Sequence, residues 1–182
     1  KYILKYNGNS AEINFPEGTT GIYKDVFAGN TDITEIVFPK EVSYIGKAAF
    51  ADCSSLKKVT FPNGTKISEF GTMAFANCTA LKSIEIPETL KILGNAPFIG
   101  CTSLSSVTIP GRFLEDFPII FKGCTAVSSL VLASGSAVVF DGVGAVEPEI
   151  GLDLSGYPRL TTLEISERVT EINPQTLSKF LY

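Results

Sequence analysis

Four cysteines are the side chains of this sequence with the widest range of possible chemistry: Cys53, Cys78, Cys101 and Cys124. No C-x-x-C pair occurs, and the four recur at intervals of 25, 23 and 23 residues. They therefore share one register of a repeat, which places the thiols in a line and not at the corners of a zinc tetrahedron. A disulfide between neighbours or a metal site is an alternative, but we expect buried structural thiols that pack as small apolar groups.

Histidine and tryptophan are both absent. The absence of histidine excludes every catalytic scheme that uses an imidazole base and every metal site that uses an imidazole ligand. The absence of tryptophan lowers the expectation of a lectin that stacks sugars, because indole rings are favoured platforms. We therefore predict a chain without catalytic residues, metal or cofactor, which is not an enzyme.

Carboxylates offer two further candidate sites. Glu35, Glu85 and Glu164 occupy outward strand positions, but they come from separate repeats without an aromatic wall, so we expect a solvated face and not a glycosidase pair. A calcium site is the alternative use of four acidic residues in a later segment, although they lack EF-hand spacing. These are Asp141, Glu147, Glu149 and Asp153.

Three glycines, Gly46, Gly71 and Gly94, also share one register, and no phosphate-binding motif accompanies them. We interpret them as backbone positions that need a small residue or a positive φ.

A repeat of about 23 residues positions all of these groups. Its clearest mark is a column of phenylalanines at Phe27, Phe50, Phe75, Phe98 and Phe121. Each cysteine follows a phenylalanine by three residues, and an aliphatic residue follows three later. Further apolar positions then alternate with polar ones, as in Ile84-Glu85-Ile86, before a proline. Several registers that agree over five units indicate a solenoid.

The alternating segment of each unit predicts a short, half-buried β-strand that proline ends. Stacking these strands in parallel builds one continuous core, with the phenylalanines on top of one another. The segment 46–56 predicts a short helical turn on the opposite side. Replacing Phe75 or Phe98 by alanine should be the most damaging change, at about 3–5 kcal/mol.

We predict a single domain over residues 1–182. Residues 1–16 form an N-terminal cap and a first strand at Ile13 and Phe15, and residues 17–133 form the regular repeats. An insertion covers 134–153, and residues 154–182 form a last repeat and a partial turn. The formal charge of −4 without a basic cluster argues against nucleic acid, and no apolar run approaches the roughly 20 residues of a transmembrane helix.

The unit Val42-x-x-Ile45-Gly46-x-x-Ala49-Phe50-x-x-Cys53-x-x-Leu56-x-x-Val59-x-Phe61-Pro62 resembles the BspA-like class of leucine-rich repeat. The resemblance covers roughly residues 10–177, with departures such as Asp116-Phe117 in place of Ile45-Gly46. It implies an α/β solenoid: a right-handed superhelix with a short-stranded parallel sheet on one face and short helical turns or loops on the other. It also implies a bacterial cell-surface or secreted protein, lipid-anchored in some members, that adheres to host or bacterial surface proteins.

The exposed strand face is the candidate binding surface, because solenoids commonly bind along such faces. Its predicted residues are Glu35, Val37, Lys58, Thr60, Ser83, Glu85, Ser106, Thr108, Ser129, Val131, Thr162 and Glu164. The insertion at 134–153 is an alternative surface. Two other functions are open. One is a structural spacer in a larger surface protein. The other is carbohydrate binding, for which the available rings besides phenylalanine are Tyr2, Tyr6, Tyr23, Tyr44 and Tyr157.

Overall fold

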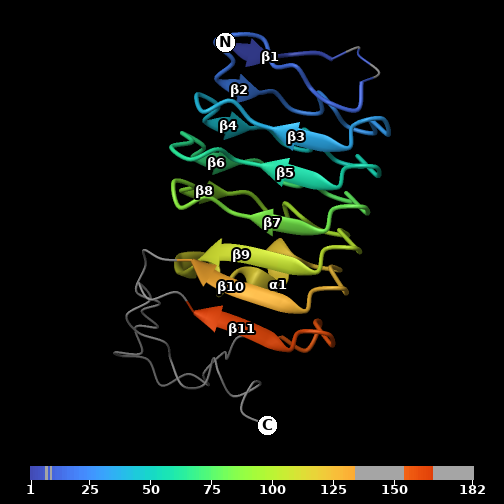
Figure 1. Cartoon of the computed structure of the whole chain (residues 1–182), viewed down its shortest axis with the longest axis vertical. Helices are drawn as coiled ribbons and strands as arrows, with labels where there is room; N and C mark the ends of the chain where they lie inside the picture. Colours follow the sequence, from blue (N-terminus) through green and yellow to red (C-terminus); the bar gives the residue numbers. More distant parts are fainter. Residues whose placement is uncertain (7, 9, 134–153, 166–182) are drawn as a thin grey trace.

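The chain folds as a parallel β-solenoid of about six turns with little helix, as a computed structural model shows (Figure 1). The structure describes residues 1–6, 8, 10–133 and 154–165, with the backbone alone at Ile165. Successive turns stack along the long axis, so segments about 23 residues apart lie side by side. The predicted leucine-rich-repeat solenoid is confirmed.

The predicted sheet runs along one face of this stack. Its strands are β3 (Glu35–Val37), β5 (Lys58–Thr60), β7 (Ser83–Glu85), β9 (Ser106–Pro110), β10 (Ser129–Ala133) and β11 (Thr162–Ile165). All pairs are parallel, and equivalent repeat positions lie opposite each other, as Ile84 does to Val107. The predicted N-terminal strand is reduced to one bridge between Glu12 and Glu35, while Ile13 and Phe15 pack against the core.

A second parallel sheet, which we did not predict, covers a neighbouring side of the stack. It consists of the two-residue strands β1 (Tyr2–Ile3), β2 (Gly21–Ile22), β4 (Tyr44–Ile45), β6 (Glu69–Phe70) and β8 (Ile92–Leu93). Strands of two residues are too short to leave an alternating pattern in the sequence. Only stacking against the neighbouring turn makes them strands.

The helical turn predicted for 46–56 is a series of tight turns instead. Ala48 and Asp52 have φ angles of 51° and 60°, and a left-handed residue ends a right-handed helix at once. Equivalent turns repeat this conformation, since Met73, Asn77 and Gly100 also have positive φ. In the described part of the chain, regular helix occurs only after β9, as the 3₁₀ helix η1 (Gly111–Phe113) and as α1 (Phe117–Ile120).

Helix α1 marks the point at which the repeat departs from its consensus. Asp116 and Phe117 stand where earlier turns have the Ile-Gly pair, and the second sheet ends at β8, one turn before. Phe117 is fully buried. Its ring centroid lies 4.9 Å from that of Phe121 and 4.8 Å from that of Tyr157. The altered residues therefore replace a surface strand with a short helix that still fills the core.

The predicted column of phenylalanines forms the centre of the core. Ring centroids are 4.8 Å apart from Phe27 to Phe50, 5.2 Å from Phe50 to Phe75, 5.4 Å from Phe75 to Phe98 and 5.5 Å from Phe98 to Phe121. All four pairs are stacked, and the exposed fraction of each ring is at most 1%. At the N-terminal end Tyr6 covers Phe27, with 4.7 Å between the two ring centroids.

The glycines at 46, 71 and 94 allow adjacent turns to approach each other. A Cβ atom at Gly46 would lie 2.6 Å from the Lys24 nitrogen and 2.7 Å from the Tyr23 carbonyl carbon. At Gly71 and Gly94 it would likewise meet the backbone of the preceding turn. None of the three has a positive φ, so close approach, and not an unusual backbone conformation, explains this register.

Several expectations fall outside the described residues. They are the insertion 134–153 with its four acidic side chains, and the repeat positions Val169, Ile172 and Leu177. Within the described part of the chain, no helix has the length and hydropathy that crossing a membrane demands.

Candidate binding face

The predicted binding residues lie on one face of the solenoid because each strand alternates buried and outward side chains. In β7, Ile84 is buried while Ser83 and Glu85 are exposed. Register then aligns the outward positions of successive turns, as in Ser83, Ser106, Ser129 and Thr162. All twelve predicted side chains are exposed or half-buried. The strand arrows that carry them form a single row in Figure 1.

This row is interrupted between β5 and β7. Strand β5 is hydrogen-bonded to β3, and β7 to β9, but β5 and β7 do not pair. Next to these strands, one main-chain hydrogen bond joins the two turns: the Lys82 N–H donates to the Lys57 carbonyl oxygen, with 3.4 Å between nitrogen and oxygen. The Phe38 and Ile86 amides each donate to the next turn, yet the equivalent amide of Phe61 has no such bond within the described chain.

A longer turn accounts for the interruption. From Phe50 to Phe75 the repeat has 25 residues instead of 23, and the extra two follow the tight turn Pro62–Thr65. That turn contains Gly64 with a φ of 75°. The added length keeps Ile67 fully buried and brings the Lys66 N–H 2.8 Å from the Lys40 carbonyl oxygen. With this longer turn, β6 still pairs with both of its neighbours in the second sheet, whereas β5 and β7 of the exposed sheet do not pair.

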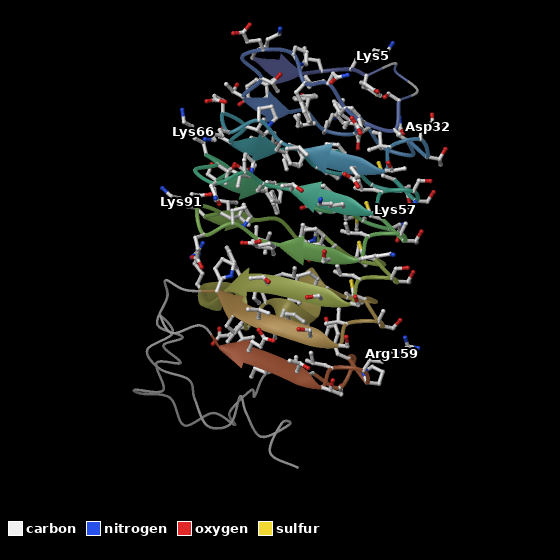
Figure 2. The ribbon with its side chains drawn as sticks, in the orientation of Figure 1. Lys5, Asp32, Lys57, Lys66, Lys91 and Arg159 are labelled. Carbon is white, nitrogen blue, oxygen red and sulfur yellow. The ribbon has the colours of Figure 1, made fainter. Side chains whose placement is uncertain are left out.

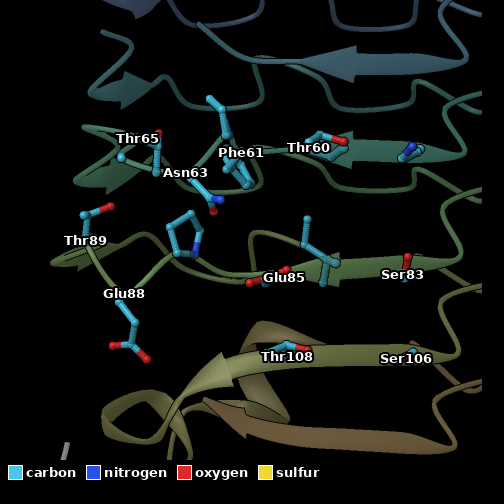
Figure 3. A pocket seen from close by; sticks show the side chains of 16 residues that line it. Thr60, Phe61, Asn63, Thr65, Ser83, Glu85, Glu88, Thr89, Ser106 and Thr108 are labelled. Carbon is cyan, nitrogen blue, oxygen red and sulfur yellow. The ribbon is translucent and has the colours of Figure 1, made fainter. Parts of the chain in front are cut away.

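A groove of about 500 Å³ lies at this opening, and we refer to it as the β5–β9 groove (Figure 3). Half of the predicted binding residues line it: Lys58, Thr60, Ser83, Glu85, Ser106 and Thr108. The turn after β5 adds Phe61, Asn63 and Thr65 along one side. From Ser83 and Ser106 the lining residues extend along the strands to Glu88 and Thr89, so the groove runs parallel to the strands.

The floor of the groove includes strand backbone. Val59 and Ile84 keep exposed fractions of 8% and 3%, whereas Leu130 and Val107, at equivalent positions of paired strands, keep none. Because β5 and β7 do not pair, the main-chain donors and acceptors on their facing edges are left without a ladder partner. The groove therefore offers hydroxyls, an amide, a carboxylate and main-chain groups within one depression.

Charge around the groove is mixed. Arg112 contacts Glu88, one of the lining residues: its guanidinium lies 3.2 Å from the Glu88 carboxylate and also donates to the Glu88 and Leu90 carbonyl oxygens. Among described residues this is the only ion pair, so Lys58 and Glu85 have no ionic partner in the described part of the chain. Both side chains are exposed, and their charges are available to a ligand.

The cysteines are buried and take no part in this face. Each thiol donates to the carbonyl oxygen of a phenylalanine in the preceding turn, at 3.1–3.2 Å. None of the four forms a disulfide, and the described residues contain no cluster of possible metal ligands. The carboxylates are also separated, since β9 and β10 lie between Glu85 and Glu164.

Two features of the surface escaped prediction. The groove depends on a two-residue difference in repeat length, which was visible in the sequence, but its effect on strand pairing was not. The second sheet gathers Tyr2, Tyr23 and Tyr44, which the sequence offered only as separate rings. Their common location follows from the unpredicted strands β1, β2 and β4.

Comparison with known proteins gives the family. The model of the BspA type leucine rich repeat region matches residues 1–128 with six copies. Among solved structures, the chain is similar to a leucine rich cell surface protein from Faecalibacterium prausnitzii A2-165, at 28% identity and a TM-score of 0.64. That match covers 74% of this chain and 35% of the other, so the chain spans about a third of that protein.

Two other solved structures support the same fold. A leucine rich repeat protein from T. pallidum matches with 21% identity and a TM-score of 0.67, covering 100% of this chain and 88% of that one. A leucine-rich repeat protein from Bacteroides capillosus ATCC 29799 has 29% identity and a TM-score of 0.51, with coverages of 58% and 83%. No curated protein matches significantly. The family match spans more than half of the sequence, and the chain belongs to the BspA-type leucine-rich-repeat family.

Proposed function

We propose that this chain is a non-enzymatic binding module that recognises a protein partner through its exposed sheet face, centred on the β5–β9 groove. The observation that carries the proposal is the groove itself, a depression of about 500 Å³ that six of the predicted binding residues line. Leucine-rich-repeat domains generally mediate protein interactions. The groove gives this general role a specific location.

The chemistry of the groove supports an extended protein segment as the bound group. Hydroxyls of Thr60, Ser83 and Thr108, one from each of three strands, line the groove and suit main-chain amides and carbonyls of a partner. Lys58 and Glu85 supply opposite charges that orient the segment. Because the strands beneath are held by the stacked core, the face is pre-organised and loses little conformational freedom on binding.

The proposed setting is the surface or the exterior of a bacterium. A structural relative at 28% identity is a cell surface protein, which supports this location. Partners in this setting are host proteins or surface proteins of other bacteria. A stack of repeats would also serve as a spacer, so the test must separate binding from spacing.

Groove-filling variants provide that test. Ser83→Trp places a large ring in the groove, while Ser103→Trp adds the same ring at an exposed turn outside it. Both variants and the wild type are applied to an array of defined bacterial and host extracellular proteins, and circular dichroism confirms that each is folded. We expect a protein ligand whose affinity falls at least about tenfold with Ser83→Trp and less than about twofold with Ser103→Trp.

The contrary results are equally clear. If the folded wild type binds no protein on the array, the spacer function is favoured over binding. If both tryptophan variants bind like the wild type, the partner uses another surface and the groove has no role in recognition.

A further inference from the structure

A cluster of three tyrosines on the second sheet forms a surface separate from the groove; we call it the tyrosine patch. Tyr2 belongs to β1, Tyr23 follows β2 directly and Tyr44 belongs to β4, so the three come from three successive turns. The exposed fractions of Tyr2 and Tyr23 are 53% and 47%, and Tyr44 is half-buried. Pairing of these strands places the three rings in one area of the surface.

The rings are held in a defined arrangement. The Tyr2 ring lies directly over Gly21, where a Cβ atom would collide with its Cε1 and Cδ1 atoms. Its centroid is 6.2 Å from that of Tyr44, with an angle of 67° between the ring planes. The Tyr2 and Tyr44 rings therefore meet edge to face, and the absence of a side chain at Gly21 leaves space for the Tyr2 ring.

Polar groups surround the rings and lack partners in the described part of the protein. No hydrogen bond joins the hydroxyls of Tyr2, Tyr23 or Tyr44 to any described residue. Glu69 lies opposite Tyr44 in the register of β4 and β6. Burial raises the pKa of Tyr44, and the charges of the neighbouring Glu69, Tyr2 and Tyr23 add to the increase.

Charged residues that follow the strands of the tyrosine patch bear on the class of ligand. Lys24 and Lys47 follow the second-sheet segments of adjacent turns and are both exposed, and the Asp25 N–H links these turns by donating to the Lys47 carbonyl oxygen at 3.0 Å. Together with Glu69 on the neighbouring strand, these lysines give the surroundings of the patch both signs of charge. Such surroundings are compatible with a ligand that is neutral and rich in hydroxyls.

We propose that the tyrosine patch binds a pyranose unit of a glycan. A pyranose has an apolar face of C–H groups, which stacks on an exposed aromatic ring, and an edge of hydroxyls, which exchanges hydrogen bonds with phenol and carboxylate groups. In the patch, Tyr2 and Tyr23 supply the exposed rings. Glu69 and the tyrosine hydroxyls supply the polar contacts. This function uses a different surface from the proposed protein-binding groove.

Titration with a panel of neutral and acidic polysaccharides, followed by intrinsic tyrosine fluorescence and calorimetry, tests the site. We expect at least one polysaccharide to bind the wild type. Tyr2→Ala and Tyr23→Ala should each weaken it about tenfold or more, and Glu69→Gln severalfold. Ile92→Ala is the matched control, since Ile92 is 57% exposed on the same sheet but outside the patch, and it should change affinity less than twofold.

Three results would overturn the glycan site. The first is that no polysaccharide binds the folded chain, and the second is that Tyr2→Ala and Tyr23→Ala bind like the wild type. The third is that Ser83→Trp abolishes glycan binding, because the sugar would then occupy the β5–β9 groove. Loss of protein binding with Ser83→Trp, while glycan binding persists, separates the two surfaces.

Discussion

The thiol of Cys78 donates a hydrogen bond to the main-chain carbonyl of Phe50, one turn earlier, with 3.2 Å between sulfur and oxygen. Cys53, Cys101 and Cys124 repeat the contact with Phe27, Phe75 and Phe98. The first turn has Asn30 at this position, whose side-chain oxygen instead accepts from the Asp32 and Ile33 amides. The cysteine column is therefore a structural device that ties each turn to its predecessor.

Burial of these thiols predicts low reactivity. With a thiol-specific disulfide reagent, the folded chain should react far more slowly than free cysteine, because neither reagent nor hydroxide reaches the sulfur atoms. In urea, all four thiols should react promptly. Ser103→Cys places a thiol at an exposed turn and is the control that should react quickly in the folded state. Fewer than four reactive thiols in urea without reductant would reveal a disulfide.

Stability should decrease in alkaline solution for the same reason. Burial raises the pKa of Cys53 to about 12, against 9.0 for an unperturbed thiol. Below pH 9 both states hold the proton, whereas between 9 and 12 only the unfolded state releases it. The free energy of unfolding then falls by up to about 1.4 kcal/mol per pH unit for each such thiol.

Urea unfolding at pH 8, 9 and 10 in the presence of reductant measures this slope. The Cys53→Ala variant should show a shallower decline than the wild type, because one titrating group has been removed. Equal slopes for the two proteins would mean that the Cys53 thiol ionises as readily in the folded state as in the unfolded state.

Gly46 is the position where close packing of turns is most directly testable. A methyl group there would lie 2.6 Å from the Lys24 nitrogen, so Gly46→Ala should destabilise the chain by about 1–3 kcal/mol or more. Gly156→Ala is the matched control, since nothing lies within 4 Å of a Cβ atom at that site. Thermal unfolding compares the two. Equal melting temperatures would contradict the close approach of the backbones.

The repeat made most of the core predictable from the sequence. The five phenylalanines and the cysteines occupy one register each, the outward strand residues occupy two, and stacking brings equal registers together. In contrast, the strands Tyr44–Ile45 and Glu69–Phe70 exist only because neighbouring turns pair there. A local pattern of two residues carries no periodicity, so the second sheet and its tyrosine patch could not be predicted.

The groove was missed for a different physical reason. The extra two residues between Phe50 and Phe75 are evident from the spacing, but a longer turn can bulge outward without disturbing either sheet. Here Ile67 is buried and the second sheet stays continuous, whereas the pairing of β5 with β7 is lost. Which of two sheets remains paired depends on packing, and the spacing does not encode it.

Amide hydrogen exchange tests the interruption of the exposed sheet. The Phe38 amide donates to the Thr60 carbonyl oxygen at 3.0 Å, while the equivalent Phe61 amide has no ladder partner in the described chain. In native conditions Phe61 should exchange at least about tenfold faster than Phe38. Equal protection of the two amides would show that β5 and β7 pair in solution and that the groove is closed.

The stacking of the turns through the phenylalanine column is tested most directly by the free energy of unfolding of Phe75→Ala, measured by urea titration. Phe75 is fully buried between Phe50 and Phe98, so its loss should cost about 3–5 kcal/mol. Val37→Ala, at a 59% exposed position of β3, should cost less than about 1 kcal/mol. A Phe75→Ala protein as stable as Val37→Ala would contradict the stacked column.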